Sequence, residues 1–130
     1  MNFDYNRFRI EQGAKVTLKN FATCETGGYT KESAKDEIQN NIRELKKYQE
    51  IFYAADKHSM LIILQAPDAA GKDGVIRHVM SGINPQGCRV HSFKTPTKNE
   101  LEHDYMWRHY LALPQRGMIE IFNRSHYENV

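Results

Sequence analysis

A short apolar strand that runs directly into a glycine-bearing turn and a helix is the feature that most restricts the fold of this chain. Residues 60–64 read Met-Leu-Ile-Ile-Leu, a continuous apolar run typical of a strand buried on both faces. A loop, residues 65–70, follows it, and residues 71–80 have the pattern of a helix stopped by Gly82 and Pro85. A buried strand that leads at once into a helix predicts an α/β layered domain.

Further strands and helices follow along the chain. Residues 88–93 and 118–122 are strand candidates, and residues 98–111 are predicted to form one helix that ends before Pro114. Alternating strands and helices imply parallel strands joined by right-handed crossovers. The residues therefore predict a parallel sheet flanked by helices.

The N-terminal part is less informative. Residues 1–30 are weakly patterned and are interpreted as an arm that lies on the domain formed by residues 31–130. A long amphipathic helix follows the arm, with Ser33 as its predicted cap and with apolar residues at helical spacing from Ile38 to Phe52.

The loop after the first strand reads Gln65-Ala-Pro-Asp-Ala-Ala-Gly-Lys-Asp-Gly74 and has the composition of a phosphate-binding turn. Gly71 lets the backbone approach a phosphate closely, and Lys72 brings a full positive charge within reach of the outer phosphates. The amide groups at the start of the helix add partial positive charge. The predicted phosphate-binding residues in this loop are Ala69, Ala70, Gly71, Lys72, Asp73 and Gly74.

The loop departs from the general pattern G-x-x-x-x-G-K-[ST] at two positions. Ala66 replaces the first glycine, and Asp73 replaces the Ser or Thr that binds Mg²⁺. Asp68 would repel phosphate unless it holds a Mg²⁺ ion or takes a proton during transfer. A plain strand-to-helix turn with a solvated Lys72 is the alternative interpretation of the loop alone.

Polar loops follow the other two strand candidates. Residues 94–97 read Lys-Thr-Pro-Thr, and residues 123–128 read Asn-Arg-Ser-His-Tyr-Glu. Ligands of open parallel sheets bind beyond the carboxyl ends of the strands. If the strands are parallel, all three loops converge on one crevice.

The bulk composition excludes several classes of function. The net charge of +2 is too small to indicate binding of a nucleic-acid polymer. The apolar run at residues 60–64 is too short to span a bilayer, and the N-terminus lacks the apolar region of a secretory signal. The two cysteines, Cys24 and Cys88, fit no metal-site spacing and are expected to be free thiols. A cytoplasmic location and no membrane partner are the default expectations.

Six segments in order carry a resemblance to a known family. They are Asp68–Gly74, Asn84-Pro-Gln-Gly87, Lys94-Thr-Pro-Thr97, Glu100-Leu-x-His-Asp-Tyr-x-Trp-Arg108, Leu113-Pro-x-Arg-Gly117 and Phe122-Asn-Arg-Ser-His-Tyr-Glu128. The series resembles the polyphosphate kinase 2 family, P-loop enzymes that move a phosphoryl group between inorganic polyphosphate and a nucleotide. The resemblance implies a P-loop NTPase-like fold over residues 31–130 and Mg²⁺ as cofactor.

The resemblance also implies roles for single residues. Lys72 would grip the transferring phosphoryl group, Asp68 would bind Mg²⁺ or activate the attacking phosphate, and Arg124 would contact phosphate as a catalytic residue. Asn123 falls at the Walker B position, where many relatives carry Asp, so metal binding there would weaken or shift to Glu128. The predicted nucleotide-binding residues are Lys94, Asn123 and Arg124, and Arg77 is predicted to face the polyphosphate.

Members of this family continue well past the third strand, into further strands and an arginine-bearing helical lid, whereas this sequence stops at Val130. The resemblance therefore predicts weak or no turnover by the 130 residues and favours self-association into a homo-oligomer. An ATP-dependent P-loop nucleotide kinase and a module that binds nucleotide or polyphosphate without turnover remain alternatives. The nucleotide would be AMP, ADP or a guanine equivalent.

Overall fold

The structure is a computed structural model of the 130-residue chain, and it describes residues 4–67 and 69–129, the last two by their backbone alone. The chain divides into two compact units, Met1–Glu37 and Ile38–Val130. No helix in the described part is both long enough and apolar enough to cross a membrane. Cys24 and Cys88 are free cysteines, as predicted.

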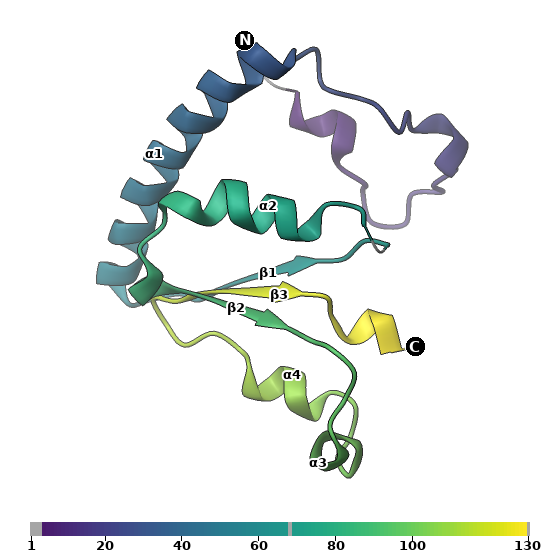
Figure 1. Ribbon diagram of the computed structural model, residues 1–130, viewed down its shortest axis with the longest axis vertical. Coiled ribbons are helices and arrows are strands. Elements are labelled where there is room, and N and C mark those ends of the chain that lie inside the picture. Colours follow the sequence, from purple (N-terminus) through teal and green to yellow (C-terminus); the bar gives the residue numbers. More distant parts are fainter. Residues whose placement is uncertain (1–3, 68, 130) are drawn as a thin grey trace. The chain divides into compact units, whose positions relative to one another are not determined.

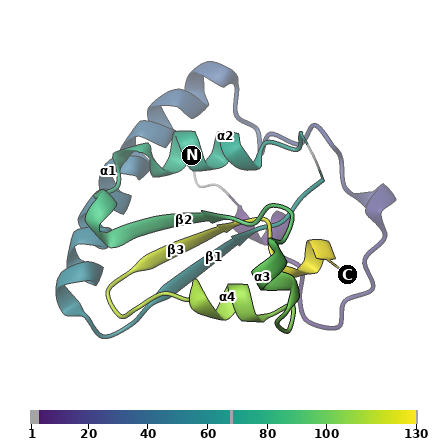
Figure 2. The same ribbon diagram turned by 60° about the horizontal axis from the view of Figure 1, so that its bottom comes forward.

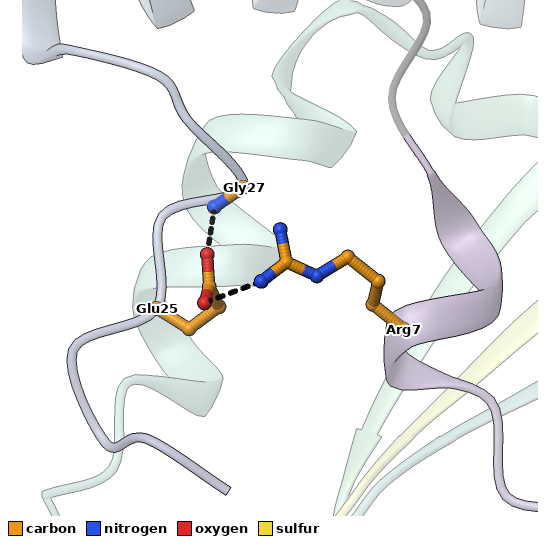
Figure 3. Close-up of polar contacts among 3 residues, drawn as sticks. All are labelled: Arg7, Glu25 and Gly27. Atoms are coloured by element: carbon orange, nitrogen blue, oxygen red, sulfur yellow. Dashed lines mark hydrogen bonds and ion pairs between the residues drawn. The ribbon is translucent and has the colours of Figure 1, made fainter.

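The first unit contains two short 3-10 helices, η1 (Tyr5–Phe8) and η2 (Leu18–Asn20). Figure 3 shows its main polar contact, in which the Glu25 carboxylate accepts hydrogen bonds from the Arg7 guanidinium and the Gly27 amide, both at 2.8 Å. An exposed ion pair of this kind contributes only about 0–1 kcal/mol. The arrangement of residues 1–30 as an arm on the domain stays a prediction.

The long helix α1 (Lys31–Ala55) begins earlier than predicted. The Thr30 hydroxyl accepts a hydrogen bond from the Ser33 amide at 3.2 Å, and the Ser33 hydroxyl accepts one from the Thr30 amide at 3.0 Å. This reciprocal pair has the form of a capping box with Thr30 as the cap. The prediction of Ser33 as the cap was therefore wrong, because Ser33 occupies the third helical position.

Three parallel strands form the sheet of the second unit: β1 (Met60–Leu64), β2 (Cys88–Ser92) and β3 (Ile119–Asn123). They lie in the order β1-β3-β2, so the last strand along the chain occupies the centre. Helix α2 (Lys72–Val79) lies on one face of the sheet and helix α4 (Trp107–Leu111) lies on the other (Figures 1 and 2). Short 3-10 helices complete the unit: η3 (Met80–Gly82), η4 (Pro85–Gly87) and η5 (His126–Asn129).

Burial along the strands differs from the sequence-based expectation. The prediction that β1 is buried on both faces was wrong, since Met60 is 45% exposed and Ile63 is 40% exposed. The central strand β3 is the buried one, and its residues 119–122 are all buried. An apolar run reports strand propensity, but the position of the strand in the sheet decides its burial.

The predicted single helix at residues 98–111 is also wrong. Two short helices, α3 (Lys98–Leu101) and α4, are separated by a turn. The Asp104 carboxylate accepts a hydrogen bond from the Met106 amide at 2.9 Å, and the Asp104 carbonyl accepts one from the Trp107 amide at 2.8 Å. Asp competes for backbone amides in this way, which favours turns over a continuous helix.

Two short loops before β2 pack closely against α1. A Cβ atom at Gly82 would lie 2.3 Å from the Ile42 Cγ2 atom, and one at Gly87 would lie 2.1 Å from the Gln49 Nε2 atom. Gln49 is only 2% exposed and donates a hydrogen bond to the Asn84 carbonyl at 3.4 Å. The glycines therefore allow the close approach of these loops to the helix.

Replacing Gly82 by Ala is expected to lower the free energy of unfolding by about 1–3 kcal/mol, because the β-branched Ile42 has little rotamer freedom to move aside. Urea denaturation followed by circular dichroism measures the change. Gly74→Ala is the matched control, since a Cβ there meets nothing within 4 Å. The contact is refuted if Ile42→Ala fails to reduce the cost of Gly82→Ala in a double-mutant cycle.

Helix α4 is held to the sheet by a buried histidine. His109 is 2% exposed, and its ring lies 4.1 Å from the Phe93 ring and 6.0 Å from the Phe122 ring, centroid to centroid. Burial lowers the pKa of His109, and the positive charge of Arg108 and the neighbouring His126 add to this effect. The neutral imidazole is therefore the form that the fold favours.

Acidification is expected to destabilise the fold through His109. The unfolded histidine takes up a proton as the pH falls below about 6.5, while the folded histidine resists it, so stability falls from that pH downward. His109→Phe should show a smaller loss of melting temperature between pH 8 and pH 5.5 than the unaltered chain. Identical losses in the two proteins would contradict the assignment.

Candidate phosphate-binding cleft

The carboxyl ends of the three strands meet at one edge of the sheet. Asn123 at the end of β3 is in register with Leu64 of β1 and with Ser92 of β2. The loops that follow the strands enclose a cleft of about 780 Å³. Its lining residues are Ala69, Ala70, Gly71, Lys72, Asp73, Ser92, Phe93, Lys94, Thr95, Asn123 and Arg124. The predicted convergence of the three loops is confirmed.

The phosphate loop turns sharply before α2. Gly71 is the N-cap residue with φ of 94°, and Ala69 also has a positive φ, 62°. A left-handed alanine costs of order 1 kcal/mol or more, and such strain is found preferentially at functional sites. Because Gly71 has no side chain to accept from them, the first amides of α2 remain available to an anion in the cleft.

Lys72, the first residue of α2, reaches back over the loop. Its ammonium group donates hydrogen bonds to the carbonyl oxygens of Ala66 and Pro67, the latter at 3.1 Å. These contacts hold the cation at the wall of the cleft. A phosphate oxygen that enters the cleft would replace a carbonyl oxygen as acceptor for the Lys72 ammonium. The hydrogen bond would then join two charged groups and would be stronger.

Two further cations come from the ends of β2 and β3. Lys94 follows β2, and Arg124 follows β3 with a left-handed φ of 73°. The Arg124 amide donates to the Leu64 carbonyl at 3.2 Å, which ties this turn to β1. Three cationic side chains on three different elements therefore line the same cleft, an arrangement suited to a polyanion.

Among the residues that the structure describes, one carboxylate lines the cleft beside these cations. Asp73, in the first turn of α2, accepts a hydrogen bond from the Asn123 side-chain amide, with Oδ1 and Nδ2 2.6 Å apart. Both residues stand where the general P-loop pattern places a different side chain. Their contact joins the phosphate loop to the central strand.

The structure does not bring every predicted residue into the cleft. Arg77 is exposed and lies more than one turn along α2, and neither it nor Gly74 lines the cavity. Asp68 and the side chain of Glu128, the two predicted metal ligands, lie outside the described residues.

The sequence placed Arg108 on a predicted helix from which it could point to the crevice, but it did not predict the contacts that Arg108 makes there. Arg108 lines an adjoining recess of about 270 Å³ together with Lys94 and Arg124. Its guanidinium donates to the Lys94 carbonyl at 2.8 Å and lies 5.4 Å from the centroid of the Phe93 ring.

A second missed contact joins the two strand ends behind the cleft. The Ser125 hydroxyl donates to the Gln65 side-chain oxygen at 2.8 Å and accepts from the Tyr127 amide at 3.2 Å. Ser125 is only 1% exposed. Its two hydrogen bonds support the loops from the wall of the recess that Arg108 also lines.

A parallel sheet that carries a Gly-Lys turn and a helix N-terminus at its carboxyl edge defines an α/β protein of the P-loop class. The chain belongs to the polyphosphate kinase 2 family, since the sequence model described as Polyphosphate kinase 2 (PPK2) matches residues 28–130.

Two relatives agree with this assignment. The chain is 48% identical to an ADP-polyphosphate phosphotransferase of Rhodopseudomonas palustris, over 100% of the chain and 45% of the relative. It is 44% identical to an AMP/ADP-polyphosphate phosphotransferase of Meiothermus ruber, over 95% of the chain and 47% of the relative. The chain therefore spans less than half the length of these relatives.

A solved structure supports the fold. The crystal structure of Polyphosphate Kinase 2 from Arthrobacter aurescens superposes with a TM-score of 0.85 at 37% identity. The match covers 94% of this chain and 44% of that protein. The P-loop NTPase-like α/β fold predicted from the sequence is confirmed.

Arg108 is expected to strengthen anion binding by fixing the position of Lys94 and by adding charge to the recess. Arg108→Lys keeps the charge but loses the planar group that spans the Phe93 ring, and should weaken binding of inorganic tripolyphosphate by about threefold to fivefold. Isothermal titration calorimetry measures this affinity, with Arg43→Lys on the exposed face of α1 as control. Unchanged affinity in Arg108→Ala would exclude the role.

Proposed function

We propose that this domain takes part in moving a phosphoryl group between inorganic polyphosphate and a nucleoside mono- or diphosphate. The observation that carries the proposal is the meeting of Lys72, Lys94 and Arg124 with a helix N-terminus in one cleft, in a chain of the polyphosphate kinase 2 family. Catalysis of phosphoryl transfer consists mainly of positioning and charge neutralisation, and these groups supply both.

Each cation has a separate task in the proposed reaction. Lys72 and the first amides of α2 hold the transferring phosphoryl group, while Arg124 neutralises charge that develops on its oxygens. Lys94, with Arg108 behind it, binds the next phosphates of the chain or of the nucleotide. The cleft thereby aligns donor and acceptor phosphates along one row of positive charge.

The acceptor nucleotide is AMP, ADP or a guanine equivalent. The relatives of Rhodopseudomonas palustris and Meiothermus ruber are named for ADP and for AMP/ADP, and a relative of Mycolicibacterium smegmatis, 34% identical over 96 residues, is named for GDP. All three match this chain while their nucleotides differ. The residues shared here are therefore proposed to recognise phosphate, which every one of these substrates contains.

Mg²⁺ is part of the proposed chemistry, because a bound divalent cation neutralises the negative oxygens of two neighbouring phosphates. Carboxylate and amide oxygens are the ligands that this ion prefers. Asp73 and Asn123 offer such oxygens at the wall of the cleft. Polyphosphate as donor, and not ATP, distinguishes the proposal from an ATP-dependent kinase. A cytoplasmic location and a homo-oligomer remain predictions.

Replacing Lys72 by Ala is expected to weaken polyphosphate binding by roughly 10- to 100-fold, because a hydrogen bond to a charged group contributes about 1.5–3 kcal/mol. Fluorescence-detected binding of a short polyphosphate and luciferase detection of ATP from ADP plus polyphosphate provide the two readouts. The melting temperature should stay within a few degrees. Lys46→Ala, an exposed lysine of α1, is the control.

The outcomes separate the candidate functions. ATP formation from ADP and polyphosphate that disappears in Lys72→Ala supports transfer. Binding that is lost without any turnover in the parent chain supports a binding module. Transfer with ATP alone as donor supports the ATP-dependent kinase, and equal affinity of Lys72→Ala and the parent chain refutes the phosphate loop.

A further inference from the structure

Two departures from the general P-loop pattern lie in contact with each other. That pattern places a hydroxyl residue after the loop lysine and an aspartate at the end of the neighbouring strand, and both serve Mg²⁺. In this chain the first position is Asp73 and the second is Asn123. The carboxylate stands on the helix, and the neutral side chain stands on the strand.

The geometry fixes the orientation of the neutral partner. Asn123 Nδ2 donates to Asp73 Oδ1 at 2.6 Å, so the amide nitrogen faces the carboxylate. The opposite orientation would place two oxygens against each other. Asn123 Oδ1 is consequently turned away, and it is buried without a hydrogen-bond partner among the described residues. A buried oxygen without a donor costs free energy unless a ligand satisfies it.

The charges around the cleft indicate a function for the Asp73 carboxylate. An aspartate at the wall of a cleft that binds a polyanion repels that polyanion. The contact between the helix and the strand does not explain the aspartate, because two neutral side chains could make the same contact. A divalent cation between carboxylate and phosphate turns the repulsion into attraction. The described residues offer one carboxylate and one amide oxygen here, and both are hard oxygen ligands that fit Mg²⁺.

We propose that Asp73 is a Mg²⁺-binding carboxylate of this P-loop and that Asn123 positions it, so that acid and neutral partner have exchanged places between the strand and the helix. The inference rests on the proposed function. When bound, the ion screens the charge of the phosphates beside Lys72. Asp73 holds the ion, and the Asn123 amide holds Asp73 toward the cleft.

The exchange predicts how four variants bind Mn²⁺, used as a spectroscopic substitute for Mg²⁺. Titration of the 130-residue chain, followed by the electron paramagnetic resonance of free Mn²⁺, gives the affinity without any turnover. Asp73→Asn should weaken binding about tenfold or more while it keeps a side chain that can still contact Asn123. Asn123→Asp alone loses the amide that holds Asp73 but adds a second carboxylate ligand, and should bind Mn²⁺ within about threefold of the parent chain.

The decisive variant reverses the exchange. The double substitution Asp73→Ser with Asn123→Asp restores the general pattern and should bind Mn²⁺ within about threefold of the parent chain, whereas Asp73→Ser alone should not. Asp36→Asn, an exposed aspartate of α1, is the control for loss of one negative charge. A melting curve of each variant shows that the fold is retained.

Two results overturn the proposal. One is Mn²⁺ affinity in Asp73→Asn within threefold of the parent chain, and the other is a double variant that binds no better than Asp73→Ser. Polyphosphate binding of the parent chain in the presence of Mg²⁺ tests the proposed function separately. Retained polyphosphate binding with unaltered Mn²⁺ affinity in Asp73→Asn rejects the exchange alone, whereas no polyphosphate binding by the parent chain rejects the function.

Discussion

The common register of three short parallel strands is the constraint on which the site depends. Hydrogen bonding aligns Leu64, Asn123 and Ser92 at one edge, so the three following loops begin within a strand spacing or two of one another. The sheet brings one cation from each loop region to the same cleft, and β3 in the centre ties the two outer strands to a buried core.

The turns after the strands are held in conformations that an isolated peptide would avoid. Ala69 and Arg124 both have a left-handed backbone conformation, and both line the cleft. The surrounding structure supplies the compensation: the Arg124 amide bonds to the Leu64 carbonyl, and Ser125 joins the loop after β3 to Gln65. Because the loops already have this conformation, ordering them costs less free energy when an anion binds.

Much of this could be predicted from the sequence, for identifiable reasons. The three strands and the helix after the phosphate loop have strong local signals, and parallel topology then places Lys72, Lys94 and Arg124 together. Local patterns could not reveal that Asp104 breaks the helix at residues 98–111, because the outcome depends on one side chain competing for a backbone amide. Nor could they show that β1 is an edge strand, since strand order follows from pairing between distant segments. The contact of Asp73 with Asn123 was equally hidden, although both residues were recognisable as departures from the pattern.

The interruption of the predicted helix between α3 and α4 has a consequence for the site. Arg108 and His109 are adjacent on the short helix α4, and they act in different directions: the imidazole packs on Phe93 in the core, while the guanidinium crosses the same ring to reach the Lys94 carbonyl. The Phe93 amide is meanwhile bonded to the Asn123 carbonyl at 3.2 Å. Phe93 is thus fixed by a hydrogen bond to the sheet and by its contact with α4. The backbone of Lys94 is therefore fixed as well, and only the side chain of Lys94 has to adjust when it binds a phosphate. The placement of this cation is therefore a property of the folded domain, and it depends on a turn that interrupts the helix at the right residue.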